Sequence, residues 1–440
     1  MRQETLTVVA RVAGVPPFTA LHTALRLIAA DRIPGAGARP RAFAAPELGI
    51  HFARLVLLEE PADAEHGSSL IFESNFDTTL EDPHAARHEH LQSLASASFA
   101  PLFSVFRHCT GFAQLSSAEQ LAELLAKHQV DSSACYQGHI ERDLKRIRLE
   151  QHLRDVLLDF FTRAPKAPLR ELYHAAREHV RLRESSDPGL AGLNLDQPLP
   201  RPDAAIRSRG LRAGIFAWIE NISTDLVALL LGQLENIRRW QRQDPEFDQR
   251  ARQEAWSERE RRTFLEIAAT EDYALQNPLT HVVPLKGAER LSLLLLSHGY
   301  IDKMAKNHFD AIGQLGGIPT IHFAKWLLID EGKRLLFFSN YDSSWESYLG
   351  DFVDRAAVGL NLAWTLTKEY PTTRYLAWLG ANDEERFKAW TRHYQRPTQV
   401  FYTAYPELGI AALNNNTWIR WGLHHPPGAA ELRAWFRRLS

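Results

Sequence analysis

The heptapeptide GIHFARL at residues 49–55 returns as TIHFAKW at residues 320–326. A second phrase follows each copy, SNFD at 74–77 and SNYD at 339–342. The first pair of phrases is 271 residues apart (51 to 322) and the second pair 265 (77 to 342), so order and spacing agree. Collinear matches at a nearly constant offset indicate that a whole domain has been duplicated in this chain.

A third match closes each copy. The pairs Cys135-Tyr136 and Phe401-Tyr402 end a strand, and the helix that follows repeats its apolar positions at an offset of 266 residues (136 to 402). Hydrophobic periodicity within a copy alternates between the strand and helix patterns. It predicts strands at 6–12, 49–59, 69–75 and 132–137 and helices at 17–30, 88–106, 117–128 and 141–161, and the same order again from 280 to 423.

That order, βαββαβ with an extra helix, is the split βαβ arrangement, in which helices cover one face of an antiparallel sheet and the other face stays apolar. Two copies in one chain can cover each other's open face. We therefore expect an α+β protein made of two ferredoxin-like repeats packed sheet to sheet. The predicted segments are a first repeat at 1–161, a helical insert at 162–279, a second repeat at 280–425 and a C-terminal tail at 426–440.

With these phrases in this order, the chain resembles the dimeric α/β-barrel superfamily in its fused, tandem form. More specifically, it is similar to a bacterial group that carries IHFAR/K, SNxD and a C-terminal strand and helix in both halves. The resemblance covers about residues 1–161 and 280–425 and implies a fold more strongly than an activity. A fused pair fills its own interface but leaves edge strands, so a monomer or a homodimer is expected.

The composition excludes several classes of protein. The 440 residues are 45% hydrophobic and 24% charged, as in globular proteins, and a formal net charge of −2 gives no field that would gather nucleic acid. Two cysteines cannot build a disulfide framework, and no CxxC, GxGxxG, GxSxG or HExxH motif is present. The first residues alternate like a strand and include no apolar signal region, so a cytoplasmic location is expected.

Within the insert, residues 207–242 carry an apolar stripe at helical spacing between two groups of arginines. Glu220, Asn221 and Asp225 interrupt the stripe, so it lacks the roughly 20 apolar residues of a membrane span. Such a helix either packs against the doubled domain or lies in a membrane interface. The second alternative predicts peripheral contact with the inner face of the membrane.

Two histidines, His51 and His322, occupy the same place in the repeated strand. Strict alternation would put His51 on the same face as Ala53. The histidines are either buried, hydrogen-bonded structural residues or acid–base catalysts that work with Asp77 and Asp342. The SNxD phrases are equally open, because Asn and Asp at a strand end are also good turn-formers and helix caps.

Residues that differ between the copies are candidates for a site that one copy kept and the other lost. His90 aligns with Tyr348, and His108, preceded by Arg107, ends a helix. His108 is predicted either to bind a haem iron, with His90 and Arg107 beside the cofactor, or to cap the helix C-terminus.

The second copy contains another candidate in Tyr341, Asp342 and Glu346. Two carboxylates four residues apart can share a helical face and act as an acid–base pair beside the tyrosine. The alternative is a helix cap followed by a first-turn acid, which the helix dipole favours.

The resemblance extends to dye-decolorising peroxidases and chlorite dismutases, which bind haem between the helices and the sheet of one repeat. It implies a haem-dependent oxidoreductase that acts on a hydrophobic or aromatic small molecule, with His108 as the iron ligand. The peroxidase motif GxxDG is absent, and its nearest match, GYIDK at 299–303, has lysine in place of the second glycine, so no catalytic aspartate is carried over. Two alternatives remain: a cofactor-free or non-haem enzyme that uses His and Asp as acid and base, and a non-catalytic scaffold that binds lipid or a membrane surface.

Overall fold

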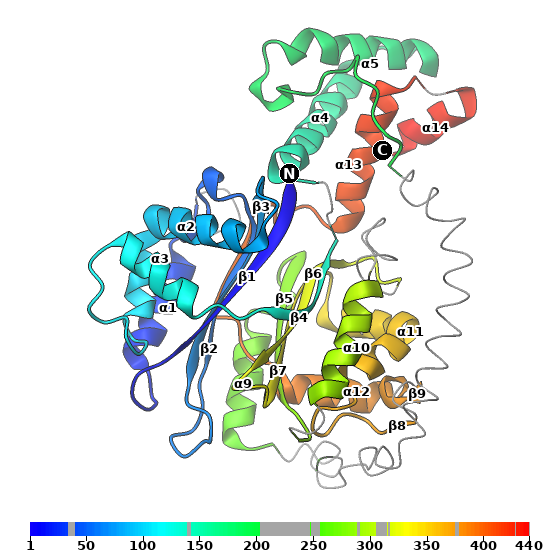
Figure 1. The fold of residues 1–440 in the computed structure, drawn as a ribbon. Helices are drawn as coiled ribbons and strands as arrows, with labels where there is room; N and C mark the ends of the chain where they lie inside the picture. Colours follow the sequence, from blue (N-terminus) through cyan, green and yellow to red (C-terminus); the bar gives the residue numbers. More distant parts are fainter. Residues whose placement is uncertain are drawn as a thin grey trace. The chain divides into compact units, whose positions relative to one another are not determined.

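The computed structural model describes residues 1–33, 40–138, 142–202, 247, 256–287, 291–304, 315, 317–374, 378–426 and 428–439. The chain divides into two compact units, one made of residues 1–141 and 216–407 and the other of residues 142–215 and 408–440. All the β-sheets of the described residues lie in the first unit (Figure 1). The mixture of antiparallel sheets and helices confirms the α+β class.

Both copies present their main elements in the same order. The first contributes β1 (Arg2–Arg11), α1 (Thr19–Ala30), β2 (Ile50–Leu58), β3 (Ser69–Thr78), α2 (Pro83–Phe106), α3 (Ala118–Lys127), β4 (Ser132–Gln137) and α4 (Leu144–Arg163). The second contributes β5 (Gln276–Pro284), α10 (Leu291–Met304), β6 (Ile321–Ile329), β7 (Arg334–Asp342), α11 (Trp345–Trp364), α12 (Glu384–Tyr394), β10 (Val400–Thr403) and α13 (Ile410–His424). Outside this common order lie α5 (Leu169–Glu184), α9 (Glu258–Ala268), α14 (Ala429–Arg437) and the short hairpin of β8 (Thr373–Arg374) and β9 (Trp378–Leu379).

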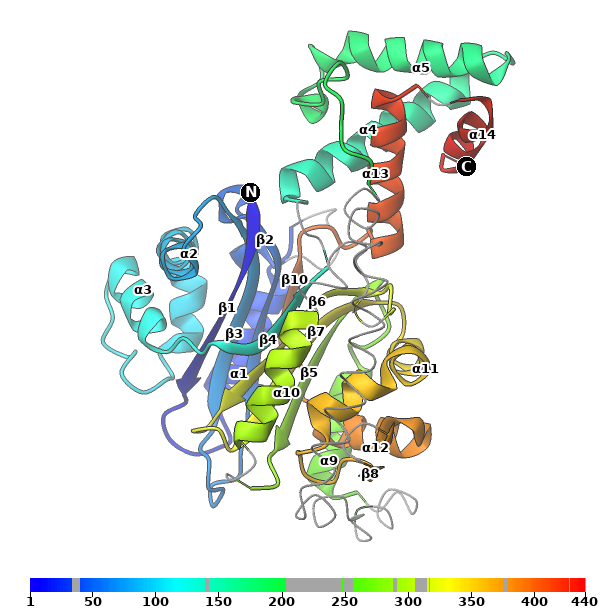
Figure 2. The ribbon, with the colours of Figure 1, turned by 45° about the vertical axis from the view of Figure 1, so that its right-hand side comes forward.

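The fourth strand of each copy joins the sheet of the other copy. β10 pairs antiparallel with β2, and β4 pairs antiparallel with β6. The sheet orders, β1-β3-β2-β10 and β5-β7-β6-β4, therefore correspond strand by strand. Figure 2 shows β10 beside the blue strands of the first copy. This exchange differs from the expectation of two self-contained repeats at 1–161 and 280–425, because each sheet is complete only when both halves of the chain are present.

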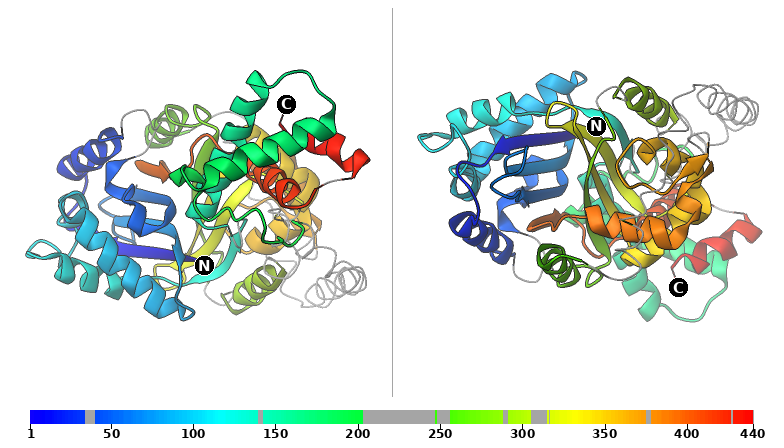
Figure 3. Two further views of the ribbon diagram at one scale, coloured as in Figure 1. Left: turned by 90° about the horizontal axis from the view of Figure 1, so that it is seen from above. Right: turned by 90° about the horizontal axis from the view of Figure 1, so that it is seen from below.

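The two sheets face each other and carry helices on their outer sides. Helices α1, α2 and α3 cover the first sheet, and α10, α11 and α12 cover the second (Figure 3). Both faces of each sheet are therefore buried, as in other layered α+β folds. Between the sheets lies an apolar cluster that draws on both copies: Val56, Leu58, Ile71, Val282, Leu327, Ile329, Leu336 and Phe338.

A β-bulge sits at the shared histidine in each copy. The register of β2 against β3 shifts between Ile50 and Phe52, and that of β6 against β7 shifts between Ile321 and Phe323. The extra residue in each bulge is the histidine, and a bulge breaks the alternation of side chains. His51 and Phe52 consequently both reach the interior between the sheets, where their rings meet aromatic rings of the other copy. The expectation that His51 lies on the face of Ala53 is therefore wrong.

The centre of the interior is charged. Arg54 of β2 is fully buried, and its Nε donates to Glu73 of β3 at 2.9 Å. Its Nη1 donates to the Leu279 carbonyl at 2.9 Å and its Nη2 to the Ser339 carbonyl at 3.0 Å, so the guanidinium ties the first sheet to β5 and β7 of the second. A buried guanidinium is stable only when its donors are met in this way.

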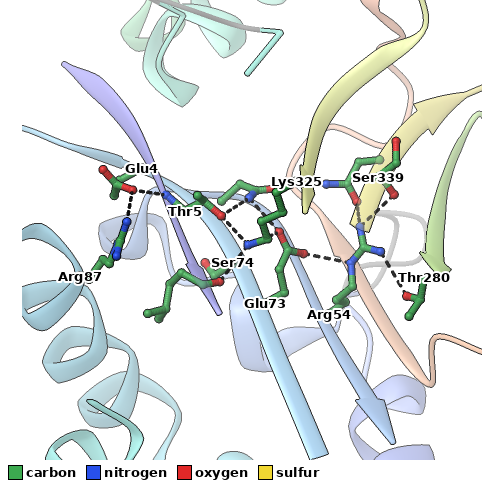
Figure 4. A network of polar contacts seen from close by, with 12 residues as sticks. Glu4, Thr5, Arg54, Glu73, Ser74, Arg87, Thr280, Lys325 and Ser339 are labelled. Atoms are coloured by element: carbon green, nitrogen blue, oxygen red, sulfur yellow. Dashed lines mark hydrogen bonds and ion pairs between the residues drawn. The ribbon is translucent and has the colours of Figure 1, made fainter. Parts of the chain in front are cut away.

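The second copy answers with Lys325, which stands where Arg54 stands in the first. Its ammonium lies 3.1 Å from the other oxygen of Glu73 and donates to Thr5 and to the Leu6 carbonyl of β1. Figure 4 shows Glu73 between the two cations. Burial lowers the pKa of both Arg54 and Lys325, and the charge of Glu73 opposes that shift. One buried carboxylate therefore serves two buried cations.

The second unit is a small helical core. α4, α5, α13 and α14 bury an apolar cluster that includes Leu153, Tyr173 and Trp435. The Trp435 indole donates to the Ile419 carbonyl at 3.0 Å, and a Cβ on Gly422 would lie 2.2 Å from the Trp435 ring. The long helices expected to end each repeat, and the tail at 426–440, thus pack with one another because their apolar faces match.

The insert predictions concern residues that are only partly described. Residues 207–242 lie outside the described residues, so the proposed membrane-surface helix stays a prediction. Within the described part of the chain, no helix combines the length and apolar character that a membrane span requires.

The charged interior yields a stability prediction. Replacing Arg54 with methionine keeps the bulk of the side chain but leaves carbonyl groups of β5 and β7 without their donor and Glu73 with one cation. We expect a loss of about 3–5 kcal/mol in the free energy of unfolding, measured by guanidinium titration. The control is Arg41→Met, which removes an exposed pair with Asp31 and should change stability by less than about 0.5 kcal/mol. Equal unfolding midpoints for the two variants would contradict the central role of Arg54.

Candidate functional site: two histidine–aspartate pairs

The first pair is His51 and Asp77. His51 is fully buried, and its Nε2 lies 2.9 Å from Oδ1 of Asp77, whose side chain is 7% exposed. The Nδ1 of His51 lies 3.0 Å from the hydroxyl of Tyr405. Because a carboxylate only accepts hydrogen bonds, we assign the ring proton to Nε2, and Nδ1 then accepts the Tyr405 proton.

The second pair repeats the first. His322 is fully buried, and its Nε2 lies 2.6 Å from Oδ1 of Asp342, whose side chain is 10% exposed. Asp77 and Asp342 are the last or next-to-last residues of β3 and β7, so both carboxylates stand at the same end of their sheets. The SNxD aspartates are therefore buried partners of the histidines and neither turn residues nor helix caps.

Tyr405 joins the two pairs into one site. Its ring centroid is 5.7 Å from that of His51 and 6.1 Å from that of His322. The residue follows β10, the strand that the second copy lends to the first sheet, and the Ala404 amide donates to the His51 carbonyl at 2.9 Å. Strand exchange thus carries Tyr405 to the histidine of the other copy.

The other exchanged strand makes the equivalent contact. After β4, the Gly138 amide donates to the His322 carbonyl at 2.7 Å. A Cβ at Gly138 would lie 2.6 Å from the Ile321 carbonyl oxygen, so only glycine allows this approach.

Two clefts open along the seams between the sheets, at pseudo-equivalent places. The first seam cleft, about 610 Å³, is lined by β1 and β4 and includes Gln3, Cys135 and Gln137. The second seam cleft, about 370 Å³, is lined by β5 and β10 and includes Gln276 and Phe401. Each glutamine lies at the register position of one site aspartate, since Gln3 pairs with Asp77 and Gln276 with Asp342. The clefts therefore approach the two pairs from opposite edges.

Gln3 links the first seam cleft to the site directly. Its Nε2 lies 3.4 Å from Nε2 of His51. On the other side, Gln276 donates to the Tyr405 carbonyl at 3.2 Å and accepts from Thr403. A molecule in either cleft would therefore be one side chain away from the histidines.

Comparison of the chain with protein-family models, with curated proteins and with solved structures gave no match. The site must be interpreted from its own chemistry.

His90 is a packing residue in its described contacts. Its ring stacks on Phe76 with centroids 3.7 Å apart, and its Nε2 lies 3.0 Å from the Ser74 hydroxyl. Burial lowers the pKa of His90 to about 3, so the ring is neutral. Its counterpart Tyr348 does the same in the second copy, stacking on a tyrosine at 4.0 Å and donating to Ser339 at 2.7 Å. These contacts occupy the ring nitrogen that a metal would need.

The haem expectation around His108 finds no assembled pocket among the described residues. His108 lies just after α2 and is half-buried beside Arg107, and burial together with that charge lowers its pKa. Burial also raises the pKa of the neighbouring Cys109 to about 12, which disfavours a thiolate ligand. Within the described residues, no group of three or more His, Cys, Asp or Glu side chains could hold a metal ion. Haem binding through His108 stays a prediction that these contacts do not support.

Tyr341, Asp342 and Glu346 are not brought together. Asp342 belongs to β7, and α11 begins only after Ser344, whose side chain caps the helix. Tyr341 faces the helices with Tyr348, whereas Asp342 faces the interior with His322. Glu346 lies in the first turn of α11 and pairs with Lys388 on the surface. The expected acid–base pair is therefore wrong, because a strand separates the side chains that a helix would have aligned.

Sequence reasoning missed Tyr405. It stands two residues beyond the end of β10, at a position where the first copy has His139. The difference between the copies was a usable signal, but the contact with His51 depends on the exchange of strands.

The buried His90 gives a pH prediction. Its pKa is below the usual value near 6.5 when folded, so the unfolded chain takes up the proton first as the pH falls. Its contribution to stability is complete above pH 6.5 and is lost progressively toward pH 3. From pH 7 to pH 5 this amounts to roughly 2 kcal/mol. His90→Tyr, which installs the residue found at Tyr348, should remove that part of the pH dependence, measured as the free energy of unfolding at both pH values.

The matched control for this measurement is His88→Tyr, on an exposed position of the same helix. It should keep the pH dependence of the original protein. A His90→Tyr variant as acid-sensitive as the control would show that His90 is not a buried neutral ring.

Proposed function

We propose that the protein is an enzyme that performs acid–base chemistry on a small molecule, with Tyr405 as the group that exchanges protons with the substrate. The observation that supports this most strongly is the hydrogen-bonded series Asp77, His51, Tyr405 inside a closed interior. It follows the logic of catalytic triads, in which an acid orients a histidine and the histidine activates a hydroxyl.

The proton path follows from the assigned tautomer. When Tyr405 acts as a base, its hydroxyl proton passes to Nδ1 of His51, and its phenolate oxygen takes a proton from the substrate. The resulting imidazolium is stabilised by Asp77, which needs no proton of its own. Return of the proton from Nδ1 restores the starting state. His322 and Asp342 place a second oriented imidazole on the other side of the Tyr405 ring, available for the opposite transfer.

Access is proposed through the first seam cleft. It is the larger of the two, and it reaches His51 through Gln3. Its lining includes charged side chains, among them Arg2, Glu4 and Arg87, which suits a substrate with polar groups. A hydrophobic or aromatic substrate and a haem-dependent oxidation remain sequence predictions for which the described site offers no specific support.

The test is proton exchange. The protein is incubated in D2O with a panel of ketones, 2-oxo acids and esters, and loss of the proton next to the carbonyl is followed by NMR. We expect at least one class to exchange faster than in buffer, and Tyr405→Phe to slow that exchange by roughly 10²-fold or more. The Tyr402→Phe variant, whose ring packs toward Phe43 on the outer face of the sheet, is the control and should keep the rate.

The outcomes separate cleanly. A folded Tyr405→Phe variant with full exchange activity would refute the role of Tyr405. An original protein with no activity on any panel member would refute this reaction type. A readout that needs no substrate is ¹⁵N NMR of the histidines, in which His51 should carry its proton on Nε2; a proton on Nδ1 would contradict the proposed path.

A further inference from the structure

A cavity of about 660 Å³ lies on the outer side of the second sheet, against β6, α10 and α11. We call it the outer pocket. Its walls are mainly apolar and include Trp326, Ile301, Phe352 and Leu360. Trp326 alternates along β6 with Lys325, which points to the interior, so the outer pocket is separated from the histidine–aspartate pairs by the sheet itself. Its volume falls within the range of about 300–1,000 Å³ that is usual for small-molecule sites.

The two copies share the helix geometry that borders this region. α2 departs from helical geometry at Ser98 and α11 does so at Ala356. Ser98 lies eight residues after His90 and Ala356 eight residues after Tyr348, the rings that stack on the sheet in each copy. The two kinks are therefore equivalent features of the duplicated fold.

The space beside the kink is filled in the first copy. There the Ser98 hydroxyl donates to the Ala42 carbonyl and holds a short helical turn, Arg41–Phe43, against α2. Phe43 is fully buried and stacks on Phe72 of β3 at 5.7 Å. In the second copy the kink residue is alanine, which has no hydroxyl to hold such a turn, and Ala356 lines the outer pocket.

One polar group of the lining has no partner. The Trp326 side chain is 3% exposed, and its indole N–H meets no hydrogen-bond acceptor in the described part of the chain. A buried donor left without an acceptor costs about 1–3 kcal/mol, which an acceptor on a bound molecule would recover. The outer pocket therefore offers an apolar volume together with one unsatisfied donor.

We propose that the outer pocket binds a neutral, mainly hydrocarbon small molecule that carries one hydrogen-bond acceptor, of the class of medium-chain ketones, esters and alcohols. The apolar walls accommodate the hydrocarbon, and the Trp326 indole N–H donates to the oxygen. The charges at the rim do not favour an ion, because Arg355 is paired with Asp351 at 3.2 Å and Asp354 lies beside it. This binding site is independent of the acid–base chemistry proposed for Tyr405.

The first experiment blocks the pocket. Binding is measured by displacement of the neutral fluorophore N-phenyl-1-naphthylamine by 2-undecanone. Gly359 lines the pocket, and a Cβ there would enter open space, so Gly359→Trp should lower the affinity for 2-undecanone at least tenfold. Gly350→Trp is the matched control: it lies on the same helix, its Cβ also enters open space, and it does not line the pocket, so affinity should be unchanged.

The second experiment isolates the donor. Trp326→Phe removes the indole N–H and keeps an aromatic ring. We expect it to weaken 2-undecanone about fivefold, the value of an ordinary hydrogen bond, and to leave undecane unaffected. Undecanoate should bind the original protein more weakly than the ketone, because the site offers no unpaired cation in the lining described.

Several results would overturn the proposal. The fluorophore or the ketone failing to bind the original protein would show that the pocket is not a site for such molecules. Equal effects of the two glycine variants would place binding elsewhere. Tighter binding of undecanoate, or of haem, would assign the pocket to a different class of ligand.

Discussion

The interior between the two sheets must hold charge, and this constraint organises the molecule. Glu73 is the carboxylate that Arg54 and Lys325 share, and all three side chains are buried. Removing two cations and a carboxylate from water is costly unless nearly every donor and acceptor is met. Those partners come from strands of both copies, so only one relative position of the two sheets satisfies them. The apolar cluster beside the network adds area, whereas the network selects the register.

Duplication made this arrangement possible and also made it asymmetric. Arg54 and Lys325 occupy equivalent places, but the equivalent of Glu73 is Phe338, whose ring lies 4.8 Å from the Arg54 guanidinium carbon. A carboxylate in both copies would have balanced the cations pairwise. Instead one copy supplies the carboxylate and the other an aromatic face, which is a weaker but compatible neighbour for a cation. The copies therefore depend on each other for charge balance as well as for their fourth strands.

The candidate site uses the same two devices, exchange and asymmetry. The bulges at His51 and His322 turn both histidines inward, and the strand ends bring Asp77 and Asp342 to them. Symmetry alone would give two equal pairs. Tyr405 breaks that symmetry because the exchanged strand delivers it to the first pair by hydrogen bond and to the second by ring contact. A chemical difference between the pairs thus arises from one residue beyond a strand.

The repeated phrases by themselves determined the duplication, the α+β class and the order of elements, because these depend on local periodicity and on residues near one another in sequence. They also identified His51, Asp77 and their counterparts as one set. The tertiary structure alone decided that these residues face inward, because a bulge overrides strand alternation. It also separated Asp342 from Glu346, and it brought Tyr405 to His51, since a strand that crosses to the other copy leaves no local trace in the sequence.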